Sequence, residues 1–301
     1  MPIQFNPTFT NDKSVKSKKK RNLSKSICAH VLGGAGLYTC QMLMYPLFDL
    51  HSKVDGKRIS NEDKVQLKGV ANKMLEVSGL KKKGVSVVYH PTEKIPISWK
   101  EYIRPHDIND LKRGTQAFFT QMGGDFPLEK ISFPTNSVNL PEEGLYTVFA
   151  HEIGHAMNAF GSNFTRFINN YKLRAYPQRI AMISIFLSAF TSKRKAEDGQ
   201  ELSKKDKIHN TVRDNAYLFP MLAAIPMLIQ EASATLRGER LAKKWIPKEF
   251  KTRMFLANRI AFSTYLLHTG ACGLGVFYAS RFKDSMVERA ERKSLKNKGV
   301  V

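Results

Sequence analysis

Four runs of residues without a formal charge interrupt an otherwise polar chain. The runs Ile27–Phe48 and Ile260–Ser280 each contain about 20 residues, which is enough for a helix to cross a lipid bilayer. The runs Ile180–Ser192 and Asn215–Gln230 are shorter, so the pattern leaves open a membrane hairpin or a buried pair of core helices. Basic residues follow the runs that end at Ser192 and Ser280, as is typical of helices anchored at a membrane surface.

The N-terminal run predicts a retained transmembrane anchor. It follows residues 1–26, which are polar and basic and are expected to form a disordered arm. A cleaved signal peptide would have a shorter apolar core that starts nearer the first residue. Gly33, Gly34 and Gly36 suit close packing of the run 27–48 against another helix. The alternative is a glycine-rich core helix of a soluble fold.

The chain between the apolar runs shows helix and strand signals of ordinary length. A capping box at Ser60 predicts the start of a helix that extends to Ser78. Val85–Val88 and Lys130–Pro134 are strand candidates, and Leu145–Phe160 has a helical pattern. We therefore expect a mainly α fold with a small β-sheet.

The charge of the chain is strongly positive. It carries 48 Lys and Arg residues against 26 Asp and Glu residues, for a formal net charge of +22. Such a charge attracts nucleic acids or anionic lipids. The basic residues are spread over all segments without a zinc-finger or RNP motif, so anionic lipid fits better than a specific nucleic acid. The three cysteines, Cys28, Cys40 and Cys272, form no CxxC pair and lie in apolar stretches, which predicts buried, inert thiols.

The string His151-Glu152-Ile-Gly-His155 points to metal chemistry. Residues four apart lie on one face of a helix, so His151 and His155 can share a zinc ion. Glu152 would face a water molecule on that zinc, and its carboxylate can take the proton and pass it to a leaving amine. This is the HExxH pattern of zinc peptidases. The alternative is a pair of surface histidines with an unrelated glutamate between them.

A catalytic zinc ion needs a third protein ligand and an open position. The metzincin spacing would place a third histidine at residue 161, which is Gly161. Glu197, Asp198 and Glu201 lie in a charged linker with abundant lysines. Glu231 instead ends an uncharged run, where a lone acid is costly unless a cation compensates it. Glu231 is therefore the predicted third ligand.

The residues after Glu231 fit this prediction. Ala232, Ser233 and Ala234 are small and would let their helix approach the HEIGH helix closely. The alternative is that Glu231 caps a helix or pairs with Arg237.

The chain resembles the membrane zinc metallopeptidases of the HtpX and CAAX prenyl protease group, and is most similar to their YugP-type neutral relatives. An alanine precedes HEIGH, Ala-Met follows it, and a Glu-x-x-Ala-Thr element comes after two apolar runs. The resemblance implies a zincin-like catalytic core of the gluzincin type, with His151, His155 and Glu231 as zinc ligands and Glu152 as general base. HtpX-type members usually have an aspartate four residues after the third ligand, whereas Thr235 matches the small hydroxyl residue of YugP-type members.

The resemblance extends to the segment before HEIGH. Thr115–Phe118 and the strand candidate Lys130–Pro134 are similar to the family's segment at this place. In that family the strand is the edge on which an extended peptide lies, so the resemblance implies the same role here.

Together these patterns predict a membrane-bound zinc peptidase, integral to the bilayer through several helices, that acts on peptides or proteins and binds no specific nucleic acid. The expected organisation is a basic arm over 1–26, an anchor over 27–48, a catalytic domain over 49–280 that includes the later apolar runs, and a basic tail over 281–301. The competing hypothesis is a non-catalytic, membrane-anchored binding protein with a structural or incidental HExxH helix. The substrate and the side of the membrane that carries the site stay open.

Overall fold

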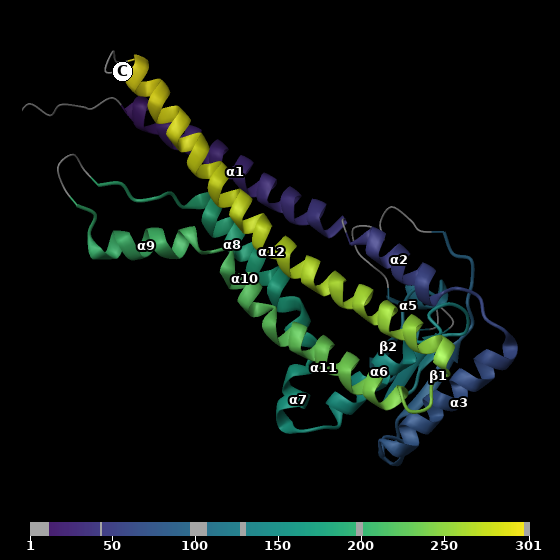
Figure 1. Ribbon diagram of the computed structural model, residues 1–301. Helices are drawn as coiled ribbons and strands as arrows, with labels where there is room; N and C mark the ends of the chain where they lie inside the picture. Colours follow the sequence, from purple (N-terminus) through teal and green to yellow (C-terminus); the bar gives the residue numbers. More distant parts are fainter. Residues whose placement is uncertain (1–11, 43, 97–106, 127–130, 197–200, 298–301) are drawn as a thin grey trace, which may run out of the picture. The chain divides into compact units, whose positions relative to one another are not determined.

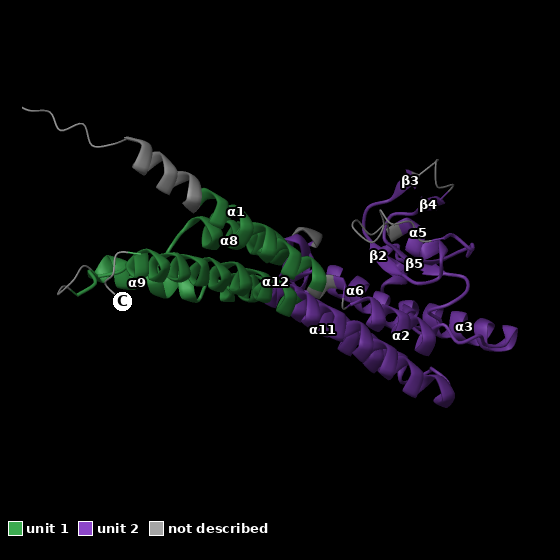
Figure 2. Ribbon diagram, turned by 90° about the horizontal axis from the view of Figure 1, so that it is seen from above, with its two compact units in different colours: residues 1–40, 176–223, 269–301 green, residues 41–175, 224–268 purple. Residues whose placement is uncertain are grey.

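Helices dominate the structure, and its strands are few and short, as the sequence predicts. The computed structural model describes residues 12–42, 44–96, 107–126, 131–196 and 201–297 (Figure 1). The chain divides into two compact units, coloured separately in Figure 2. Unit 1 comprises residues 1–40, 176–223 and 269–301, and unit 2 comprises residues 41–175 and 224–268.

The described residues of unit 1 form helices and connecting segments, without a strand. The helices are α1 (Asp12–Met42, of which all but the last two residues belong to this unit), α8 (Tyr176–Phe190), α9 (Lys204–Asp214), α10 (Leu218–Ala223) and the C-terminal part of α12 (Lys248–Asn297). Small residues bring α1 and α12 together, because a Cβ on Gly33 would lie only 2.7 Å from the Cβ of Ala279. The close packing expected of this glycine is confirmed, whereas a Cβ on Gly34 would meet no atom within 4 Å.

The N-terminal helix differs from the prediction at both ends. It begins at Asp12, so residues 12–26 are helical and do not form the expected disordered arm; residues 1–11 lie outside the described residues. Lysine is a good helix former, which favours this extension. The helix ends at Met42 and α2 (Tyr45–Asp55) begins with Pro46 in its first turn. Proline suits a helix start but cannot continue the preceding turn, so the single helix expected over 27–48 is wrong.

One of the cysteine predictions is also wrong. Cys272 is buried, but Cys28 is exposed on α1.

Two helices among the described residues are long and apolar enough to cross a membrane. The first is Leu218–Ala242, which includes α10 and α11 (Ile225–Ala242), and the second is α12. The first contains the apolar run expected at 215–230 apart from its first three residues, and the second contains the run expected at 260–280. The run at 180–192 lies in α8, apart from its last two residues.

Unit 2 combines helices with two small sheets. It contains α2, α3 (Asn61–Val77), η1 (Lys81–Lys83), β1 (Ser86–His90), α5 (Asp107–Lys112), β2 (Phe118–Thr120), β3 (Gly124–Phe126), β4 (Ile131–Phe133), β5 (Ser137–Pro141), α6 (Phe149–Ala159), α7 (Asn163–Ile168), η3 (Tyr171–Ala175), α11 and the N-terminal part of α12. The Ser60 side chain accepts a hydrogen bond from the Asp63 backbone at the start of α3, which confirms the predicted cap.

The main sheet has the strand order β1-β5-β2. The central strand β5 pairs in parallel with β1 and antiparallel with β2, so that Val138 lies between Val87 and Phe119. All five residues of β5 are buried. The core of unit 2 joins this strand to α3, α6 and α12 through Met74, Phe149 and Met254, among others.

The strand expected over 130–134 forms, but it lies elsewhere. It is β4, which pairs with β3 in a separate two-stranded sheet. The last strand before the HEIGH helix is β5, which pairs on both sides, so the two edges of the main sheet are β1 and β2. The peptide-binding edge implied for 130–134 by the family resemblance is therefore not an edge of the main sheet.

Candidate metal centre

The HEIGH residues form the buried helix α6, and its first turn is fixed by a carboxylate from α2. Asp55 accepts hydrogen bonds from the Thr147 backbone at 3.0 Å, the Thr147 hydroxyl at 2.6 Å and the Val148 backbone at 3.2 Å. An acid is favourable at this end because backbone N–H groups and the helix dipole are positive there. Burial raises the pKa of Asp55, although these hydrogen bonds and the charge of Arg253 act in the opposite direction.

Two glycines bring α6 and α11 into backbone contact. A Cβ on Gly154 would lie 1.9 Å from the Ala234 carbonyl oxygen, and a Cβ on Gly238 would lie 1.8 Å from the Ala150 carbonyl oxygen. Residue 150 thus faces 238 and residue 154 faces 234, so the helices cross in antiparallel register at four-residue spacing. The close approach expected from the small residues after Glu231 is confirmed. Gly238, which the sequence analysis missed, contributes as much as the glycine of the motif.

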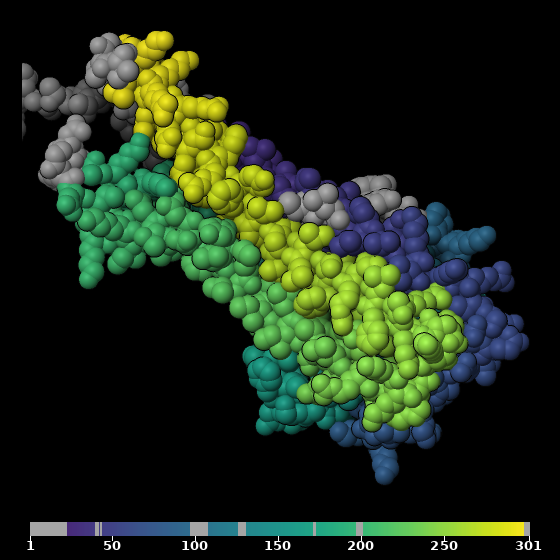
Figure 3. All heavy atoms as spheres, in the orientation of Figure 1, coloured from purple at the N-terminus to yellow at the C-terminus, as the bar shows by residue number. Residues whose placement is uncertain are grey.

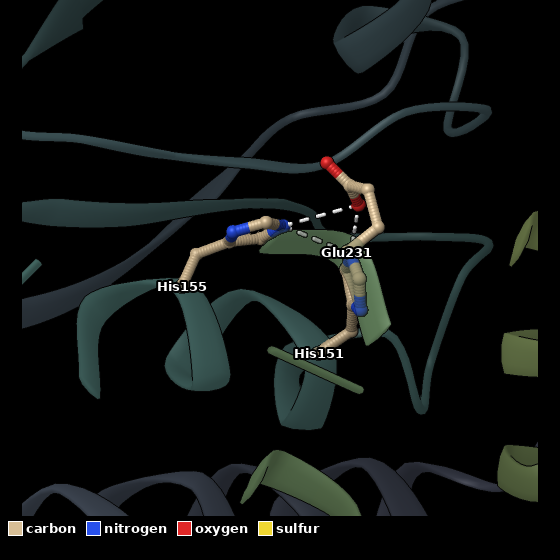
Figure 4. Close-up of side chains that lie close together, drawn as sticks. All are labelled: His151, His155 and Glu231. Atoms are coloured by element: carbon tan, nitrogen blue, oxygen red, sulfur yellow. Dashed lines mark hydrogen bonds and ion pairs between the residues drawn. The ribbon is translucent and has the colours of Figure 1, made fainter. Parts of the chain in front are cut away.

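This crossing brings three candidate ligands together (Figure 4). The Nε2 atoms of His151 and His155 lie 3.1 Å apart. Glu231 Oε2 lies 3.2 Å from the first and 3.3 Å from the second. All three residues are buried, and Glu231 is fully excluded from solvent. These residues could therefore hold a metal ion.

The donor set fits a zinc ion. Two imidazole nitrogens and a carboxylate oxygen gather at one place, an arrangement that is unfavourable unless a cation or shared protons lie between them. Donors at about 2.0–2.1 Å from a tetrahedral zinc ion are separated by about 3.3 Å, close to the spacing observed here.

Each histidine has a polar partner for its second nitrogen. Nδ1 of His151 lies 3.0 Å from the Thr235 hydroxyl, and Nδ1 of His155 lies 3.4 Å from Oδ1 of Asn169. If each Nδ1–H donates to its partner, both Nε2 lone pairs are left for the metal, which is the usual arrangement of histidine ligands. Thr235, noted in the sequence only for its match to YugP-type members, therefore orients a ligand.

Glu231 also forms an ion pair with Arg174, a residue that no sequence pattern marks. Arg174 in η3 contacts Glu231 Oε1 at 2.7 Å. Arg237, the partner named by the alternative interpretation, instead lies near Gly161, where a Cβ would be 3.3 Å from its guanidinium.

A third histidine lies near the centre. His51 in α2 is buried, and its Nε2 has no hydrogen-bond partner within the described part of the chain. Burial, reinforced by the nearby charge of His151, lowers the pKa of His51 to about 4. Burial also lowers the pKa of His151, but the hydrogen bond to Glu231 and the charges of Glu152 and Glu231 outweigh it and raise that pKa overall. No sequence pattern marks His51, because α2 and α6 are far apart along the chain.

The other candidate residues are placed as follows. Glu152 is buried beside His151 on α6. Glu201 is exposed and pairs with Lys207 within unit 1. Glu197 and Asp198 lie outside the described residues.

No protein-family model matches the sequence, and comparisons with curated proteins and with solved structures found no match either.

Proposed function

We propose that the chain is a membrane-bound zinc peptidase with a zincin-like core of the type found in the HtpX and CAAX prenyl protease group. The observation that carries this proposal is the convergence of His151, His155 and Glu231 around one point, with the buried Glu152 next to the first ligand. A catalytic zinc site typically has three protein ligands and a further carboxylate nearby, here Glu152. Structural zinc sites usually have four protein ligands.

The protein groups have separate tasks. A zinc ion held by the three ligands would polarise the scissile carbonyl and acidify a water molecule. Glu152 is the group that would take a proton from the attacking water and pass it to the leaving amine. Thr235 and Asn169 keep the two imidazoles in the tautomer that leaves Nε2 free for the metal. The burial of these groups excludes bulk water and strengthens each electrostatic contact.

The surface of unit 1 supports a location in the bilayer. Its core is rich in alanine, while many large apolar side chains are exposed. They include Ile27, Val31, Tyr38, Met182, Ile183, Phe186, Leu187, Phe219, Leu222, Leu274, Tyr278 and Phe282. Figure 3 shows one side of α12 lying open at the surface along the helix. Soluble proteins rarely expose so many large apolar side chains on one set of helices, whereas lipid chains would cover them. The net charge of +22 suits an anionic lipid surface.

A glutamine at position 152 tests the peptidase proposal. Glu152→Gln keeps the size of the side chain and leaves all three ligands in place, but its amide cannot accept a proton. We expect this variant to bind one zinc ion per chain. In an assay with a peptide library, it should cleave none of the peptides that the wild type cleaves. Full turnover by Glu152→Gln would remove Glu152 from the mechanism. Zinc binding by a wild type that cleaves no peptide would favour the non-catalytic alternative.

A further inference from the structure

The segment that follows the HEIGH helix contacts two of the three candidate ligands, His155 and Glu231. It runs from Asn163 to Ala175, includes α7 and η3, and packs against α6 and α11. Asn169 contacts His155 from this segment, and Arg174 contacts Glu231. A single stretch of chain therefore constrains ligands that come from two different helices.

The two oxygens of Glu231 have different surroundings. Oε2 faces the Nε2 atoms of both histidines at 3.2 and 3.3 Å. Oε1 forms an ion pair with Nη2 of Arg174 at 2.7 Å. The Arg174 side chain is 42% exposed, so part of the guanidinium stays hydrated while Nη2 contacts the buried carboxylate. Because a guanidinium does not lose its proton at physiological pH, this contact does not depend on titration.

We propose that Arg174 is a positioning residue that keeps Glu231 bound to the metal ion through one oxygen only. This inference rests on the proposed metal centre. A carboxylate can ligate with one or two oxygens, and a second oxygen from Glu231 would take the position that a catalytic zinc site keeps open. By occupying Oε1, Arg174 leaves that position available, in the manner of other polar partners that orient metal ligands.

Two effects of Arg174 on metal affinity oppose each other. The guanidinium charge repels an incoming cation, whereas the fixed carboxylate lowers the entropy cost of binding it. Affinity alone therefore does not test the proposal, and the number of metal ligands does.

The test uses the full-length protein in detergent, loaded with Co2+ as a spectroscopic probe. Arg174→Gln removes the charge and the forked donor, Arg174→Lys keeps the charge with a single donor group, and Arg166→Gln is a matched control. Arg166 lies in the same segment and is exposed, and its side chain donates a hydrogen bond only to Asn163 among the described residues. X-ray absorption gives the number of oxygen and nitrogen ligands, and the visible Co2+ bands weaken as that number rises.

We expect Arg174→Gln to gain one oxygen ligand and to lose Co2+ band intensity, Arg174→Lys to stay close to the wild type, and Arg166→Gln to match it. An unchanged ligand number and spectrum in Arg174→Gln would overturn the proposal. So would the same spectral change in Arg166→Gln, because it would indicate a general loosening of the segment. Failure of the wild type to bind Co2+ or Zn2+ would overturn the metal centre itself. The absence of peptidase activity in a metal-loaded wild type would leave the role of Arg174 standing.

Discussion

A methyl group at residue 238 should separate the two helices that carry the metal ligands. In Gly238→Ala the new Cβ would lie 1.8 Å from the Ala150 carbonyl oxygen. Real Cβ atoms essentially never approach another atom more closely than 3.0 Å, so the contact is too short by about 1.2 Å. The obstacle is backbone in a buried helix, so α11 has to move away from α6.

The size of this movement decides the effect on the site. Glu231 lies seven residues before Gly238 and on the same face of α11, so it moves with the helix. Metal–ligand distances tolerate only about 0.2 Å, much less than the required separation. Overpacking in a buried contact costs about 1–3 kcal/mol of folding stability. We therefore expect Gly238→Ala to unfold at a lower temperature. We also expect it to bind zinc at least about tenfold more weakly, the effect seen when the residues that orient a metal ligand are removed.

The assay combines thermal unfolding followed by circular dichroism with zinc content after dialysis against a zinc buffer. Gly69→Ala is the matched control, because Gly69 lies in helix α3 of the same unit and an added Cβ would meet no atom within 4 Å. Alanine in a helix is about 1 kcal/mol more favourable than glycine, so the control should match or exceed the wild type. Wild-type stability and zinc affinity in Gly238→Ala would refute the backbone contact between α6 and α11.

Three further variants test other parts of the structure. Gly33→Ala should lower the unfolding temperature of the detergent-solubilised protein, because its Cβ would clash with Ala279, whereas Gly34→Ala should not; equal temperatures would contradict the α1–α12 contact. Asp55→Asn presents an amide to three donors and should lose about 1–3 kcal/mol in urea unfolding; no loss would show that the helix start does not need the carboxylate. The depressed pKa of His51, about 4 against 6.5 when unfolded, stabilises the metal-free protein above pH 6.5 by about 3 kcal/mol relative to pH below 4. This stability is lost as the pH falls from 6.5 to 4, and His51→Gln should flatten that part of the unfolding profile; an identical profile would place His51 in a solvated environment.

The parts of the site that depend on local spacing could be predicted from the sequence. The separation of His151 and His155 by one helical turn is a property of the chain itself. Glu231 could be predicted because a buried acid needs a cation, and the small residues after it indicated a close helix contact. The same reasoning gave the glycine contact of α1, since a run of small residues suits close packing.

The parts that depend on distant segments could not be predicted. Asp55 and His51 reach the HEIGH helix from α2, which is about 90 residues earlier in the chain, and no periodicity links the two segments. Arg174 lies in a short 3-10 helix with no distinctive pattern. The pairing of β4 with β3, rather than with the main sheet, follows from long-range register, which strand propensity does not encode. Pro46 in the apolar run indicates a helix start, and it lies in the first turn of α2, so this proline is the local signal for the break between α1 and α2.

Zinc content per chain, compared between the wild type and Glu231→Ala, tests the proposed metal centre most directly. Full-length protein is stripped of metal, incubated with zinc, dialysed and analysed by atomic emission, with Glu201→Ala as a control because Glu201 is an exposed acid that pairs with Lys207. We predict one zinc ion in the wild type and in Glu201→Ala, and none retained in Glu231→Ala, because two imidazoles leave the ion undercoordinated. Wild-type zinc content in Glu231→Ala would contradict the metal centre formed by His151, His155 and Glu231.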